Sequence, residues 1–141
     1  MNELEKAYID GLDGIDLEEN QEIIIQSKNA ELIYGFLHRN KKSSEIDHDR
    51  LKEEIINTKN LIYIFLICYL LHYDSFCKVE DIVIESKDLY QIYKFAKYFE
   101  KINKEKLFSA MLEYGSEYWI KKFLEEIEFN KDKFKNYLLF I

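Results

Sequence analysis

Four short polar hinges recur along the chain at nearly constant spacing, and this repeat constrains the fold more than any other feature. In order, the hinges are Ser27-Lys28-Asn29, Thr58-Lys59-Asn60, Ser86-Lys87-Asp88 and Tyr114-Gly115-Ser116. Successive hinges begin 31, 28 and 28 residues apart. A period of this size indicates a repeat architecture in which each unit is one supersecondary element.

Apolar residues occupy the same positions relative to each hinge. Two residues before the first residue of each hinge stand Ile25, Ile56, Ile84 and Leu112. Six residues after it stand Ile33, Ile64, Ile92 and Ile120, and we call each such set of equivalent positions an apolar column. Ser, Thr, Asn and Asp cap helix starts because their side chains accept hydrogen bonds from free backbone N–H groups. Each hinge is therefore predicted to end one helix and to cap the next, so that the repeat unit is a helical hairpin.

Neither helix of such a hairpin can bury its apolar stripe alone, whereas a stack of hairpins shares one continuous core. We therefore predict an all-α fold, a short α-solenoid of about four helical hairpins with a period of about 28–31 residues. A single domain is expected over residues 1–141. It would comprise an N-terminal helix and acidic loop (1–17), the repeats (18–128) and a C-terminal capping helix (130–141).

Two copies of the repeat carry a resemblance to a known family. The stretches SKNAELIYGFL and SKDLYQIYKFA, which begin at Ser27 and Ser86, resemble the HEAT-like helical-hairpin repeats of uncharacterised proteins from AT-rich bacteria and their phages. The resemblance covers about residues 18–128. It implies a packing pattern and a binding surface, and it brings no catalytic residue.

The remaining composition favours a folded cytoplasmic protein. Hydrophobic residues make up 48% of the chain and charged residues 33%, with no proline and four glycines, which leaves helices uninterrupted. The eleven apolar residues Leu61–Leu71 are too few to span a bilayer, which takes about 20. We expect them to form a helix buried on all sides.

The N-terminus lacks the basic segment followed by an apolar segment that is typical of a signal peptide. Cys68 and Cys77 are expected to be buried free thiols.

Negative charge is concentrated at the N-terminal end. Residues 1–26 contain eight acidic side chains against Lys6 alone, a net charge of −7 that equals the net charge of the whole chain. We expect a short peripheral helix over 2–9 and then a loop over 10–20. A concentrated acidic surface steers encounter with a basic partner and disfavours phosphate backbones. The candidate binding residues are Asp10, Asp13, Asp16, Glu18, Glu19 and Glu22; the alternative is that acids at helix starts only suit the helix dipole.

Three aromatic residues complete the candidate interface: Tyr90, Tyr118 and Trp119 fall outside the apolar columns. Exposed Tyr and Trp are the usual hot spots of protein interfaces. We hypothesise a non-enzymatic protein-binding module, a small inhibitor of the anti-CRISPR, anti-defence or immunity type that blocks a basic, nucleic-acid-binding surface of a target protein. The sequence does not identify that target or the oligomeric state.

Two other functions stay open. A nucleic-acid-binding protein could use the basic patch Arg39, Lys41 and Lys42 together with lysines nearer the C-terminus, although the acidity of the chain counts against it. A structural protein could self-associate through the exposed end of the stack. Enzyme activity is not expected, because the sequence contains no phosphate loop, nucleophile elbow or paired-carboxylate motif. No metal or cofactor site is expected either, since an EF-hand begun at Asp10 would place Leu12 and Gly14 at ligand positions.

Overall fold

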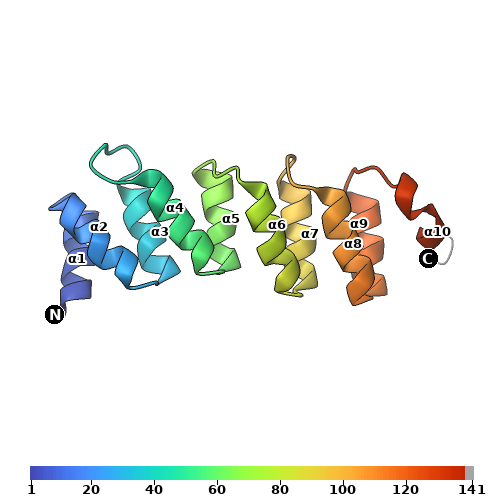
Figure 1. Ribbon diagram of the computed structural model, residues 1–141, viewed down its shortest axis with the longest axis horizontal. Coiled ribbons are helices and arrows are strands. Elements are labelled where there is room, and N and C mark those ends of the chain that lie inside the picture. The colour runs from blue at the N-terminus through green and yellow to red at the C-terminus, as the bar shows by residue number, and fades with distance from the viewer. Residues whose placement is uncertain (139–141) are drawn as a thin grey trace. The chain divides into compact units, whose positions relative to one another are not determined.

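The computed structural model describes residues 1–138, and that part of the chain is helical with no strand, which confirms the predicted all-α repeat (Figure 1). The structure divides into two compact units, Met1–Asp74 and a second that begins at Ser75. Each unit has buried apolar residues of its own. The expectation of one domain over residues 1–141 stays a prediction.

The first unit contains five helices whose neighbours in sequence pack together. They are α1 (Glu3–Leu12), α2 (Leu17–Gln26), α3 (Ala30–Arg39), α4 (His48–Asn57) and α5 (Leu61–Leu70). Contacts join α1 to α2 and α3, α2 to α3, and α3, α4 and α5 to one another. Contacts within this unit thus run mainly between consecutive and next-but-one helices, which is how a helical repeat buries its core.

The second unit continues the same pattern. It contains α6 (Phe76–Glu85), α7 (Leu89–Tyr98), α8 (Lys104–Tyr114) and α9 (Glu117–Glu126), followed by the 3-10 helix η1 (Asp132–Phe134) and the short α10 (Lys135–Leu138). Contacts again join consecutive and next-but-one helices, α6 to α7 and α8, and α7 and α8 to α9. The repeat therefore governs packing in both units.

The hinges have the predicted double role. At the first three, the opening hydroxyl donates to a carbonyl of the helix that ends there, and the third residue accepts from a backbone N–H of the next helix. The middle lysine of each has a left-handed backbone: φ is 53° at Lys28, 58° at Lys59 and 56° at Lys87. One short segment thus closes one helix and caps the following one.

The fourth hinge follows the same path with different residues. Gly115 takes the left-handed position, with φ 77°, and Ser116 accepts from the backbone N–H of Trp119 at 3.4 Å. Tyr114 cannot bend a short hydroxyl back onto its own helix, and its Oη donates instead to the carbonyl of Ile84 at 2.9 Å. The conformation that recurs is therefore set by position in the repeat and not by residue type.

The N-terminal helix corrects one prediction. Instead of ending near residue 9 and giving way to a loop over 10–20, α1 continues through Gly11 to Leu12, and α2 begins at Leu17. The helix is also not peripheral, because Ala7 is only 2% exposed and α1 packs on both α2 and α3. Glycine is required at position 11 of this helix because the ring of Phe36 occupies the space where a side chain would otherwise lie.

The apolar helix α5 corrects a second prediction, since it is not buried on all sides. Ile64, Ile67 and Cys68 form its buried face. On the opposite face Ile62 is 61% exposed and Tyr69 is 56% exposed. Within the first unit α5 contacts α3 and α4, and its three buried residues lie on one side of the helix. No helix within residues 1–138 is long and apolar enough to span a membrane.

The two cysteines differ in environment. Both are free, and Cys68 is buried as expected, with its pKa raised to about 12 by that burial. Cys77 is exposed at the start of α6, which corrects the expectation of two buried thiols.

The C-terminal segment, predicted as one capping helix over 130–141, is broken within the described residues into η1 and α10. It does cover the last hairpin: Phe134 is buried, and its ring centroid lies 5.0 Å from that of Phe108. The part of the predicted helix over 139–141 lies outside the described residues.

Candidate partner-binding surfaces

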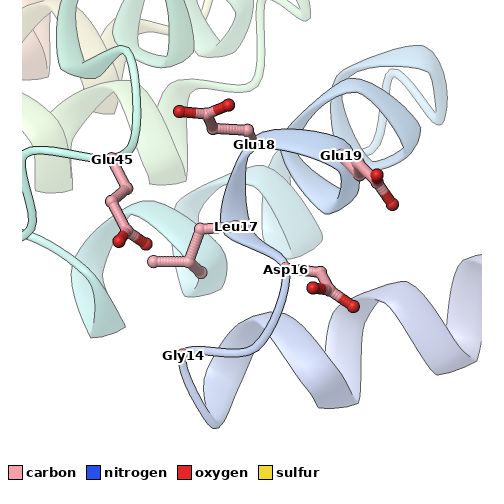
Figure 2. Close-up of a pocket in the computed structure, with 6 residues that line it drawn as sticks. All are labelled: Gly14, Asp16, Leu17, Glu18, Glu19 and Glu45. Carbon is pink, nitrogen blue, oxygen red and sulfur yellow. The ribbon is translucent and has the colours of Figure 1, made fainter.

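Four acidic residues of the first unit line one shallow cavity, which we call the acidic surface. Asp16, Glu18, Glu19 and Glu45 line it together with Gly14 and Leu17, and its volume is about 430 Å³ (Figure 2). The turn between α1 and α2 builds it. Gly14 has φ 76°, Asp16 has φ 47°, and the 5% exposed Leu17 holds the start of α2 against the core.

Glu45 was not among the predicted acids. It comes from the linker between α3 and α4, which is tied to α2 because the backbone N–H of Asp47 donates to Oε1 of Gln21 at 2.6 Å. The neighbouring Ile46 is buried and fixes the same segment. A single isoleucine in an otherwise polar linker was the sequence signal that this segment packs on the first hairpin.

The other predicted acids have different environments. Asp13 is exposed at the end of α1, and Asp10 lies 4.0 Å from the ammonium of Lys6. Glu22 is paired with Arg50 through both carboxylate oxygens, one of them at 2.8 Å from Nη2. This hydrogen bonding lowers the pKa of Glu22. The charge of Glu22 is therefore locally compensated, and we leave it out of the acidic surface.

The acidic surface is suited to diffuse attraction and not to chelation. Figure 2 shows the carboxylates of Glu18 and Glu19 pointing in different directions. Within residues 1–138, no group of three or more His, Cys, Asp or Glu side chains is placed to hold a metal ion. Like charges that diverge in this way raise the local negative potential over an area, which attracts basic surfaces.

The three predicted aromatic residues meet on the second unit and form what we call the aromatic surface. Tyr90 comes from α7, and Tyr118 and Trp119 come from α9, which packs on α7. The Trp119 ring centroid lies 5.8 Å from that of Tyr90 and 5.0 Å from that of Tyr118. Tyr90 is 49% exposed and Tyr118 is 65% exposed. Both tyrosines lie four residues after the first residue of a hinge, so the repeat itself brings them together.

A polar network that sequence reasoning missed supports this surface. The buried Tyr93 lies with its ring centroid 5.6 Å from that of Trp119. Its Oη donates to Oε1 of Glu126 at 2.8 Å, and Lys97 donates to both groups. Lys122 lies 3.0 Å from the other carboxylate oxygen of Glu126. Hydrogen bonds from Lys97, Tyr93 and Lys122 lower the pKa of Glu126 to about 2.

The network predicts a distinctive acid titration. Because the pKa of Glu126 falls from 4.5 to about 2 on folding, its contribution to stability is present above pH 4.5 and is lost as the pH falls through about 2. Carboxyl-carbon NMR should give a midpoint near 2 for Glu126, and Tyr93→Phe should raise it by removing one donor. Glu126→Gln should make the stability less dependent on pH in the acid range. A Glu126 midpoint at the ordinary value would show that the network does not form.

The predicted basic patch is divided in the structure. Nε of Arg39 donates to the carbonyl of Leu12 at 3.0 Å, so this side chain holds the end of α1. Lys41 and Lys42 are exposed in the linker after α3, where both line a separate cavity with Leu37. Arg39 is not among the residues that line that cavity.

The two surfaces place most of the predicted interface residues in two clusters, one on each unit. Comparison with known proteins adds no further assignment. No family model, no curated protein and no solved structure matches this chain.

Proposed function

We propose that this protein is a non-enzymatic protein-binding module that acts by occupying a basic surface of a partner protein. The observation that carries the proposal is the aromatic surface: two tyrosines, about half exposed or more, packed around Trp119 in the second unit. Large rigid aromatic side chains supply contact area at low entropic cost, and they dominate the binding energy of many protein interfaces.

The acidic surface supports the choice of a basic partner. Asp16, Glu18, Glu19 and Glu45 surround one cavity, and of these only Asp16, Glu18 and Glu19 belong to the strongly acidic N-terminal segment. Such charge raises association rates with a basic protein, and its effect weakens as salt screens it. Nucleic-acid-binding grooves carry concentrated positive charge of this kind. A protein that blocks it would act as an inhibitor of the anti-CRISPR, anti-defence or immunity type.

Charge reversal of the acidic surface tests the proposal. We expect Asp16→Lys, Glu18→Lys, Glu19→Lys and Glu45→Lys in combination to abolish capture of a basic partner from nuclease-treated lysate of the source cell. The matched control reverses four exposed acids outside this surface: Glu3, Glu5, Glu31 and Glu85. Three of these also lie in the first turn of a helix, as Glu18 and Glu19 do, so effects on the helix dipole are balanced.

The aromatic surface is tested with the purified partner. Trp119→Ala and Tyr118→Ala should each weaken binding at least about tenfold by calorimetry, whereas Tyr69→Ala, an exposed tyrosine of the first unit, should change it less than about twofold. Binding that survives both sets of variants with an unchanged salt dependence would overturn the proposal. Loss of every partner after nuclease treatment would instead favour nucleic-acid binding.

A further inference from the structure

A second cavity of the first unit collects basic side chains in a chain that is acidic overall. It has a volume of about 370 Å³ and lies where the ends of α3 and α5 meet the start of α4. Leu37, Leu70 and Leu71 supply its apolar wall. Its polar lining consists of three lysines and two histidines, and no carboxylate lines it: Lys41, Lys42, Lys52, His48 and His72.

The three ammonium groups are not neutralised by neighbouring carboxylates. None of the ion pairs that the described part of the chain contains involves Lys41, Lys42 or Lys52. Elsewhere many lysines are paired, as Lys97, Lys106, Lys121 and Lys122 show. Three lysines without an ion-pair partner thus line one cavity.

Complementation of helix dipoles does not account for the whole arrangement. Cations near a helix C-terminus are favourable, and this explains basic residues just after α3 and α5. Lys52, however, lies in the interior of α4 and is half-buried. Its position is therefore not explained by a favourable interaction with the C-terminal end of a helix dipole. It nevertheless lines the same cavity as Lys41 and Lys42, which come from the linker.

His48 holds the linker that carries two of these lysines. Its Nε2 lies 2.7 Å from the backbone oxygen of Ser43 and donates to it, since a carbonyl oxygen can only accept. The same linker is tied to α2 through Asp47 and Gln21. These two hydrogen bonds fix the backbone of the linker that carries Lys41 and Lys42.

We infer that this cavity binds the phosphate of a small organic phosphate of about mononucleotide size. Lysine is a common point-charge ligand for phosphate. Three such charges suit a phosphate monoester dianion better than a single carboxylate. Ligand cavities of about 300–1,000 Å³ accept one small molecule, and the leucine wall offers an apolar surface for the part of that molecule beyond the phosphate. The inference concerns a site separate from both proposed partner-binding surfaces.

The test uses the full chain and adenosine 5′-monophosphate as the probe. By calorimetry at low salt, we expect saturable binding that is at least tenfold tighter than binding of adenosine, which lacks the phosphate. Amide shifts in NMR spectra of the unaltered protein should centre on Lys41, Lys42, His48 and Lys52. Equal binding of the two probes, or shifts centred elsewhere, would overturn the inference, as would absence of binding by both this probe and inorganic pyrophosphate.

Matched lysine variants distinguish binding at this cavity from nonspecific attraction to positive charge. Lys41→Gln, Lys42→Gln and Lys52→Gln combined should weaken binding at least tenfold. Lys28→Gln, Lys59→Gln and Lys101→Gln combined remove the same charge from exposed positions outside the cavity and should change binding less than twofold. Equal losses in the two triple variants would overturn the inference. Circular dichroism checks that both remain folded, and the NMR mapping stands without any variant.

The source of the phosphate is distinguished with a short oligonucleotide bearing either a 5′-phosphate or a 5′-hydroxyl. If the 5′-phosphorylated strand binds more tightly than the mononucleotide, the cavity recognises the phosphate at the end of a strand. If the mononucleotide binds more tightly, the ligand is a free small molecule. Either order supports the phosphate site, whereas oligonucleotide binding that ignores the 5′-phosphate and excludes the mononucleotide would contradict it.

Discussion

Phe108→Ala is expected to lower the free energy of unfolding of the second unit by about 3–5 kcal/mol. Phe108 lies in α8, has no exposed surface, and is surrounded by other rings. Its ring centroid lies 5.1 Å from that of Phe123, 4.9 Å from Phe129 and 5.0 Å from Phe134. Truncation removes the buried ring and leaves a cavity that three rigid neighbours cannot fill by small shifts. The C-terminal segment should also loosen, because Phe134 packs on this ring.

Urea denaturation followed by tryptophan fluorescence measures this effect. Trp119 is the only tryptophan of the chain and lies in the second unit, so it reports the unfolding of that unit. Tyr118→Ala is the control, because Tyr118 is 65% exposed and its truncation leaves no buried cavity. The transition midpoints are compared, since a change next to Trp119 alters its intensity. A Phe108→Ala midpoint within error of the control would contradict the packing described for α8.

Gly11→Ala is expected to destabilise the first unit, although alanine is the better helix former. A Cβ at Gly11 would lie 2.6 Å from two carbons of the Phe36 ring, which is fully buried. Overpacking of this kind costs about 1–3 kcal/mol, and the gain in helix propensity offsets only about 1 kcal/mol. We expect a net loss of up to about 2 kcal/mol.

Gly35→Ala is the matched control for this prediction. A Cβ at Gly35 would also meet a close neighbour, the hydroxyl of Tyr8. That atom is the far end of a half-buried side chain that can turn away, so the stability should be unchanged or should rise by up to about 1 kcal/mol. Thermal unfolding by circular dichroism and amide hydrogen exchange of α3 measure both variants. The prediction fails if Gly11→Ala is as stable as Gly35→Ala.

The sequence was sufficient to predict the helical repeat. Ser27, Thr58 and Ser86 mark the ends of helices, and the residues that cap the next helices follow two positions later, because these interactions are local. Even the altered fourth hinge could be aligned, since glycine readily adopts the left-handed conformation that the second position requires. The proximity of Tyr90 and Tyr118 follows from the same periodicity.

Only the tertiary structure decided how the surfaces are composed. Glu45 joins the acidic surface because the linker packs on α2, and Lys52 shares a cavity with Lys41 because α4 meets that linker. The exposure of Ile62 on α5 likewise depends on which faces neighbouring helices cover.

The difference between what the sequence predicts and what only the tertiary structure decides has one physical cause. Helix ends and the period of apolar residues depend on hydrogen bonds and side-chain spacing within a few residues. These local features can be read from the amino-acid sequence. Pairings such as Gln21 with Asp47, or Gly11 against Phe36, join residues more than twenty positions apart. They depend on how whole helices pack, and that packing is decided by the shape of the assembled core.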